Sequence, residues 1–164
     1  LHLCDRRQRQ MCIRDSLQTN KVKYIIEDME LIHSVDSIKL ASEIDRHAAR
    51  VNKVQDILIE VNVGGEESKS GIAPDQLEEL LWQAGQLSHV HVRGLMTIPP
   101  VEGDEKFLYK MQQLYLDISS KKMDNIDMEI LSMGMSGDFA TAIRYGSTLV
   151  RIGTALFGAR NYQK

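Results

Sequence analysis

Residues 130–160 read ILSMGMSGDFATAIRYGSTLVRIGTALFGAR, and this stretch decides the fold. Two apolar segments flank a short helical segment. Each apolar segment ends in a turn that contains glycine, SMGMSG in the first and RIGT in the second. Strand–helix–strand order without a hairpin signal predicts two parallel strands joined by a right-handed crossover. Ligands bind at the carboxyl ends of parallel strands, so the two turns are the first candidates for a binding site.

The same alternation extends toward the N-terminus. Period-2 and branched apolar patterns predict strands within residues 30–37, 56–65 and 90–100. Helical periodicity predicts helices within 17–29, 37–52, 74–88 and 104–123, with Ser37 as an N-cap. An open doubly wound sheet and a closed (β/α)8 barrel both satisfy this order. Five strands alone suit the open sheet, because a barrel needs three more.

The composition of the chain is that of a globular protein and argues against several other classes. The chain has 164 residues, 43% hydrophobic and 26% charged, with a net charge of −3, which is typical of a globular domain. The slightly negative net charge does not indicate a basic surface that binds nucleic acid. No apolar run approaches the roughly 20 residues of a membrane span. No signal-peptide core is visible. These features predict a cytoplasmic protein that binds neither nucleic acid nor membranes.

Residues 1–16, LHLCDRRQRQMCIRDS, differ from the rest of the chain. They contain four arginines and both cysteines, and they lack a usable apolar period. The MCIRDS string resembles translated sequencing-adapter sequence, so we interpret 1–16 as a non-native head and 17–164 as the folded domain. Cys4 and Cys12 have no second cysteine pair, and we expect neither a zinc site nor a disulfide.

The two turns have the chemistry of a phosphate site. Ser136 is expected as the N-cap of a helix that starts near Gly137, and helix N-termini favour anions. Ser132 lies just before the first glycine of its turn. Gly153 would let the backbone approach an anion, and Thr154 can donate a hydroxyl. The alternative is that all of these are turn residues only.

Arg151 lies in the middle of an apolar strand. It alternates with Leu149 and Gly153 on one face of the segment LVRIGT. A buried arginine is costly unless it is paired, so Arg151 pairs with a structural carboxylate or faces a ligand. Beside a pyridine nitrogen, an arginine that stays protonated would keep that nitrogen unprotonated.

These residues resemble a known family. The opening stretch, together with LQTNKVKYI, IHSVDSIKLA, VNVGGEESKSGI and VRGLMTIPP, is similar to the pyridoxal phosphate homeostasis (YggS/PROSC) family, which has an alanine-racemase-like fold type III barrel. The resemblance covers nearly all of residues 17–160. It implies an α/β fold, a partial (β/α)8 TIM barrel of about five C-terminal β-α units. It also implies a protein of intracellular pyridoxal 5'-phosphate homeostasis that binds and releases this cofactor without net turnover.

The resemblance also implies a cofactor site. Its expected residues are Ser132, Ser136, Arg151, Gly153, Thr154 and Met96. The phosphate would be held by Ser132, Gly153 and Thr154, with help from Ser136. Arg151 would face the pyridine nitrogen, and Met96 would line the pocket. No catalytic residue and no metal ligand is expected.

The Schiff-base lysine of the family is missing from the sequence. The family carries it on the first barrel strand in a segment resembling VSKT, and a GEN-like segment follows on the second; neither is present. We therefore expect an N-terminally truncated chain that holds the last five strands. Lys69 in ESKSGI is an alternative amine, but it would need burial or a neighbouring cation to act as a nucleophile.

Three histidines in or beside the predicted strands have structural interpretations. His33 is expected to be a hydrogen-bonded barrel histidine, and His89 and His91 have no acidic neighbour in sequence that would suggest a metal site. The alternative function is a fold type III enzyme such as an amino-acid racemase. An unrelated phosphate-binding enzyme would need a carboxylate base, for which Glu60 is the nearest candidate. The intact family member is expected to be a monomer, whereas open barrel edges predict self-association or aggregation.

Overall fold

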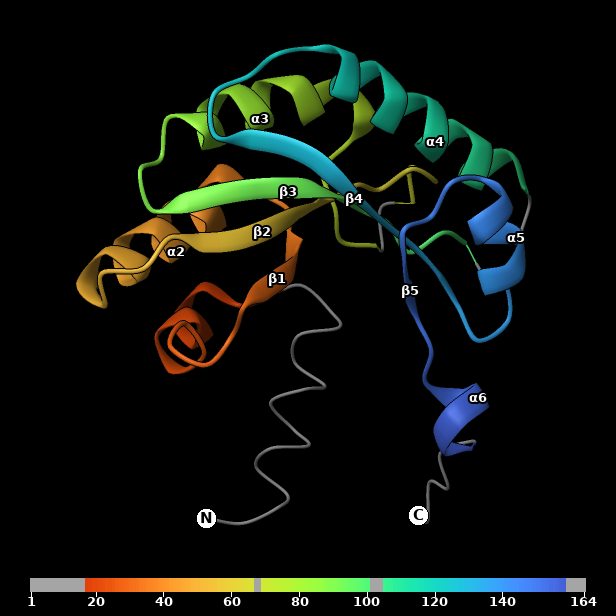
Figure 1. The fold of residues 1–164 in the computed structure, drawn as a ribbon, viewed down its shortest axis with the longest axis horizontal. Helices are drawn as coiled ribbons and strands as arrows, with labels where there is room; N and C mark the ends of the chain where they lie inside the picture. The colour runs from red at the N-terminus through yellow and green to blue at the C-terminus, as the bar shows by residue number, and fades with distance from the viewer. Residues whose placement is uncertain (1–16, 67–68, 101–104, 159–164) are drawn as a thin grey trace.

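A computed structural model describes residues 17–66, 69–100 and 105–158 (Figure 1). Five strands form one parallel sheet in the order β1-β2-β3-β4-β5. They are β1 (Leu31–Val35), β2 (Gln55–Glu60), β3 (Val90–Met96), β4 (Ile126–Met135) and β5 (Leu149–Arg151). The helices are η1 (Thr19–Tyr24), α2 (Ile38–Arg50), η2 (Pro74–Gln76), α3 (Leu77–Gly85), α4 (Glu105–Ser120), α5 (Phe139–Arg144) and α6 (Thr154–Phe157).

The sheet curls into a half-barrel. Helices α2, α3 and α4 lie along its convex side, and β1 and β5 form its two edges (Figure 1). The prediction of a partial (β/α)8 barrel with five β-α units is therefore confirmed. The open doubly wound sheet is wrong for this chain, because the curl gives the sheet an inner face and an outer face.

The hydrophobic core lies between the outer face of the sheet and the helices. Alternate residues of neighbouring strands pair in register and point outward, as Ile57 does opposite Val92 and Leu95 opposite Leu131. All four are at most 1% exposed. Burying an aliphatic side chain of this size stabilises the fold by about 1.5–3 kcal/mol. The residues between them point to the inner face, and that face carries the polar groups.

The predicted helices are present, with corrections at their ends. The first, predicted over 17–29, is the shorter 3-10 helix η1. Val22 within it is buried, and so are Ile25 and Ile26 in the turn that follows. Ser37 occupies the N-cap position of α2, but its hydroxyl donates to Asp36 at 3.0 Å and makes no capping bond. The interpretation of residues 1–16 falls outside the described residues.

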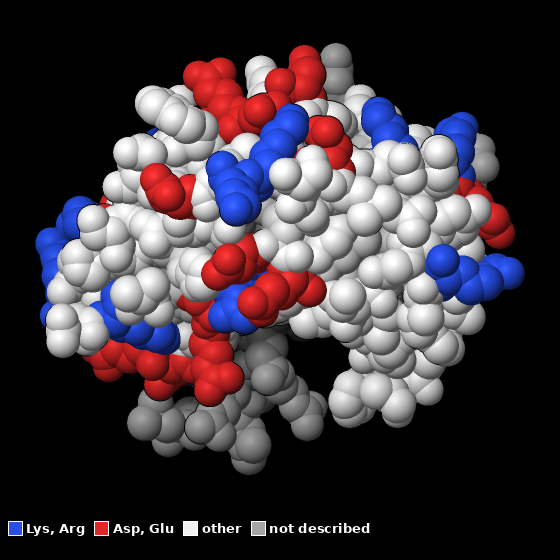
Figure 2. Space-filling model, turned by 45° about the horizontal axis from the view of Figure 1, so that its top comes forward, with Lys and Arg blue, Asp and Glu red and all other residues white. Residues whose placement is uncertain are grey.

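The surface carries charges of both signs. On the side drawn in Figure 2, acidic and basic side chains are interspersed among uncharged residues. Some of the ion pairs join neighbouring elements, as Lys121 at the end of α4 does by reaching Glu78 of α3 at 2.9 Å. Within the described ranges, no helix combines the length and the hydrophobicity that a membrane span requires.

The curl depends on a close approach of two backbones at Gly94. Its φ is +151°, and a Cβ atom at this position would lie 1.8 Å from the carbonyl oxygen of Ile130 on β4. The register between β3 and β4 shifts beside this contact. Register shifts of this kind are β-bulges, which bend and twist a sheet.

Gly94→Ala is therefore expected to destabilise the chain severely. The added methyl group collides with backbone that cannot move without breaking the β3–β4 ladder, and we expect a loss of at least about 3 kcal/mol. Urea unfolding followed by circular dichroism measures it. Gly137→Ala is the control, because its Cβ would meet open space. Equal unfolding midpoints for the two variants would contradict this account of the curl.

Candidate functional site

Arg151 joins the carboxyl ends of three strands on the inner face. From β5, its Nη1 atom donates to the carbonyl and the hydroxyl oxygen of Ser132 on β4, at 3.1 and 2.5 Å. Its Nη2 atom donates to the carbonyl oxygen of Thr97, just after β3, at 2.9 Å. Thr97 was not predicted as a site residue, because its contribution is a backbone carbonyl that any residue carries.

Ser132 and Met96 lie side by side on the inner face, beneath Arg151. Glu60 pairs in register with Met96, and Met96 pairs with Ser132. All three are at most 2% exposed. Glu60 also accepts a hydrogen bond from the Ser70 hydroxyl at 2.8 Å, which ties the following loop to β2. The carboxyl ends of β2, β3 and β4 thus present a carboxyl, a thioether and a hydroxyl in one row.

Ser136 has a different role from the one predicted. Helix α5 begins at Phe139, and its N-cap is Asp138, whose Oδ1 accepts from the Met135 amide at 2.7 Å. The prediction that Ser136 caps a helix starting near Gly137 is wrong. The Ser136 hydroxyl oxygen instead accepts from the amides of Gly153 and Ala155, at 3.2 and 3.1 Å. It holds the turn at the start of α6.

The β5–α6 turn therefore directs two backbone N–H groups at one oxygen. Thr154 lies between these two amides as the first residue of α6, and it is exposed. A Cβ atom built on Gly153 meets no atom within 4 Å. The Ala155 amide was not predicted, because the sequence did not show that Ser136 would reach this turn. Two converging amides and a hydroxyl are donors that suit a phosphate group.

His33 lacks the hydrogen bond that the sequence predicted. Its Nδ1 atom is buried without a partner. Burial lowers the pKa of His33, and the positive charge of Arg151 lowers it further. The expectation of a hydrogen-bonded barrel histidine is wrong for this nitrogen.

The lysines near the predicted site have ordinary surroundings. Lys69 lies in the loop after β2, where its Nζ atom is 3.2 Å from a carboxylate oxygen of Glu66. Lys21 and Lys23 are exposed on η1. Lys69 thus faces a carboxylate, whereas a nucleophilic lysine requires burial or a neighbouring cation.

The amino ends of the strands carry ion pairs. His91 does have acidic partners, contrary to the sequence-based expectation, with Asp56 at 3.3 Å and Asp127 at 2.9 Å. Arg93 lies 3.1 Å from Asp56 and also pairs with Glu129. Within the described ranges, no group of three or more histidine, cysteine and acidic side chains could hold a metal ion.

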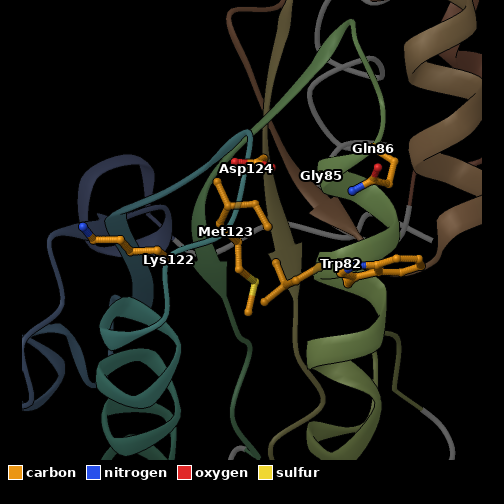
Figure 3. A pocket seen from close by; sticks show the side chains of 8 residues that line it. Trp82, Gly85, Gln86, Lys122, Met123 and Asp124 are labelled. Atoms are coloured by element: carbon orange, nitrogen blue, oxygen red, sulfur yellow. The ribbon is translucent and has the colours of Figure 1, made fainter.

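A pocket of about 240 Å³ also lies at the amino ends of the strands. Figure 3 shows Trp82 and Gln86 of the α3 end on one side, and Lys122, Met123 and Asp124 of the α4–β4 connection on the other. It is at the end of the sheet opposite to Arg151 and the β5–α6 turn. We assign the candidate site to the latter, because the converging donors and the buried polar row lie there.

Comparison with known proteins matches residues 5–161 to the alanine racemase N-terminal domain. The chain belongs to this family. It is 49% identical over 150 residues to the pyridoxal phosphate homeostasis protein of Aquifex aeolicus, covering 89% of this chain and 65% of the relative. The protein of the same name from Pasteurella multocida is 38% identical, and the match covers 90% of this chain and 65% of that relative. The chain thus spans about 65% of the length of these curated relatives.

Solved structures agree with this family assignment. PipY of Synechococcus elongatus, a COG0325 family member solved with pyridoxal phosphate bound, superposes with a TM-score of 0.77 at 32% identity, covering 87% of this chain and 68% of PipY. The resemblance to the pyridoxal phosphate homeostasis family is confirmed. An alanine racemase of Clostridium difficile superposes with a TM-score of 0.65 at 17% identity, covering 89% of this chain and 38% of the racemase. This similarity shows a shared fold alone.

Ser136→Ala is expected to loosen the β5–α6 turn. The Gly153 and Ala155 amides lose their acceptor, so their hydrogen exchange should accelerate roughly two- to tenfold, the equivalent of one ordinary hydrogen bond. Exchange measured by NMR on the two amides tests this. Ser120→Ala is the control, because its hydroxyl bonds only within α4, to Asp117. Unchanged exchange in Ser136→Ala would show that Ser136 does not hold the turn.

Proposed function

We propose that this chain forms the phosphate and pyridine side of a pyridoxal 5'-phosphate site in a protein of intracellular cofactor homeostasis. The observation that carries the proposal is the β5–α6 turn, where the Gly153 and Ala155 amides converge beside Thr154. The named function of the relatives and the cofactor held by PipY support it. The racemases share the fold only, and they give no support for racemase activity.

The described residues fit the cofactor in two places. At the turn, the Gly153 and Ala155 amides donate to the Ser136 hydroxyl, and a phosphate oxygen would accept from the same two amides. The two donors already point at one position. On the inner face, Met96 offers an apolar contact and Arg151 a guanidinium held by Ser132 and Thr97. The cofactor supplies an electrophilic aldehyde when bound.

Each residue of the chain has a physical task in this site. Thr154 and the two amides bind the phosphate, with hydrogen bonds strengthened by its charge. Ser132, whose hydroxyl bonds to Arg151, acts by fixing the guanidinium in place. The arginine side chain carries only N–H donors and does not give up its proton, so Arg151 favours an unprotonated ring nitrogen. This arrangement suits binding and release better than electron withdrawal through the ring.

Isothermal titration of the chain with pyridoxal 5'-phosphate and with inorganic phosphate tests the proposal. Reversible binding of the cofactor, competed by phosphate, is the expected result. If the chain binds neither ligand, the proposed function is wrong for it. Incubation with L-alanine and chiral analysis of the product tests the racemase alternative in the same preparation.

Replacing Ser132 and Thr154 together with alanine is expected to weaken cofactor binding. The Thr154 replacement removes a hydrogen bond to the phosphate, and the Ser132 replacement removes the hydroxyl that holds Arg151. A lost hydrogen bond to a charged group costs roughly 1–3 kcal/mol, so the affinity should fall at least tenfold. Ser119→Ala combined with Thr141→Ala is the matched control, since both residues lie on exposed helix surfaces. An unchanged affinity in the Ser132/Thr154 double variant would reject the assignment of these two residues to the cofactor site.

Arg151→Glu is expected to change the absorbance spectrum of the bound cofactor. A carboxylate beside the ring nitrogen favours its protonated form, whereas the guanidinium favours the unprotonated form. Spectra recorded across pH, with far-UV circular dichroism as a check on folding, measure the change. Arg93→Gln serves as the control, because Arg93 pairs with Asp56 and Glu129 at the other end of the sheet. The same spectrum in Arg151→Glu and the unsubstituted chain would place Arg151 away from the ring.

A further inference from the structure

His33 lies where β1 carries one residue more than its neighbour. Ile32 pairs with Ile57 and Val35 with Ile59, and all four belong to the core on the helix side. Two residues of β1, His33 and Ser34, thus stand opposite a single residue of β2. This is the arrangement of a β-bulge, which changes the direction of a side chain and is frequent beside functional sites.

The bulge places His33 on the inner face, within the electrostatic reach of Arg151. The two residues come from β1 and β5, the opposite edges of the sheet (Figure 1). The positive charge of Arg151 nevertheless contributes to the lowered pKa of His33. The curl of the sheet therefore brings the two edges to one site, where Glu60 of β2, Met96 of β3 and Ser132 of β4 share the same face.

The Nδ1 atom of His33 could accept or donate a hydrogen bond that the protein does not supply. It is buried and makes no hydrogen bond in the structure. Buried polar atoms are almost always hydrogen-bonded, and an exception in a folded protein requires an explanation. A structural histidine would satisfy both nitrogens from the protein. The imidazole is neutral at neutral pH, since its pKa is lowered, so it has one acceptor and one donor nitrogen.

We propose that His33 is a ligand-contacting residue whose Nδ1 atom makes a hydrogen bond with a polar group on the pyridoxal ring. This inference rests on the proposed function. It assigns His33 to the ring and not to the phosphate, because the phosphate donors lie in the turn after β5, whereas His33 stands on β1. The ring would lie between Arg151 and His33, with the two residues contacting different polar groups.

The first test uses the unsubstituted chain and needs no variant. The ring nitrogens of His33 are followed by 15N NMR while pyridoxal 5'-phosphate or inorganic phosphate is added. Pyridoxal 5'-phosphate should shift the Nδ1 resonance, and inorganic phosphate should leave it in place. The resonances of His89, which lies near Asp45 at the amino end of β3, should respond to neither ligand.

The second test separates this inference from the proposed function. His33→Ala and His33→Gln should each weaken pyridoxal 5'-phosphate binding by about tenfold, the loss expected for one hydrogen bond, and leave inorganic phosphate binding unchanged. His89→Ala should bind both ligands as before. If the unsubstituted chain binds the cofactor while His33→Gln binds it equally well and the Nδ1 resonance does not move, the inference is overturned and the proposed function stands. If the unsubstituted chain does not bind the cofactor, both are overturned.

Discussion

A half-buried guanidinium must be surrounded by hydrogen-bond acceptors, and the Arg151 side chain meets this requirement at the carboxyl end of the sheet. It uses the carbonyl oxygens of Thr97 and Ser132 and the Ser132 hydroxyl. These acceptors belong to β4 and to the residue after β3, while the arginine belongs to β5. The carboxyl ends of three strands are therefore fixed relative to one another by one side chain that cannot lose its charge. The positions of the candidate site residues depend on this arrangement.

The curl of the sheet is the second condition for the site. In a flat sheet, β1 and β5 would be separated by the width of three strands, and His33 would not experience the charge of Arg151. Register shifts occur between every pair of neighbouring strands, and each shift adds local bend and twist. At Gly94 the absence of a side chain allows the β4 backbone to approach. Backbone geometry thus determines which side chains meet.

The sequence predicts the elements of this fold well, because their signals are local. The branched residues of β2 and the helical period of α2 need no tertiary context, and the strand–helix alternation implies parallel pairing. The residues of the site were found through their turns and through the resemblance to a family. Their hydrogen bonds were harder to predict. Ser136 and Asp138 are both good N-cap residues in the same short turn, and propensity alone does not choose between them.

The partners of Ser136 show why such errors arise. Its hydroxyl bonds to amides seventeen and nineteen residues later in the chain, a contact that exists only once β4 and β5 are paired. The bulge at His33 is hidden for the same reason, since it appears only when β1 is aligned with β2. The local pattern predicted Ser136 as a site candidate and His33 as a hydrogen-bonded barrel histidine. In both cases long-range register determined the contacts that the residue makes. Sequence reasoning therefore selects candidate residues more readily than it predicts the contacts of each one.

The contact between Ser136 and the turn also bears on how a phosphate could enter. The Ser136 hydroxyl gives the Gly153 and Ala155 amides an acceptor before any ligand arrives. A phosphate oxygen that replaces the hydroxyl offers the same amides a charged acceptor, and such bonds are about twice as strong as neutral ones. The exchange favours the anion, while the displaced hydroxyl can turn and donate its own hydrogen to the phosphate. A turn that is satisfied in both states allows reversible binding, which is the behaviour that the proposed function requires.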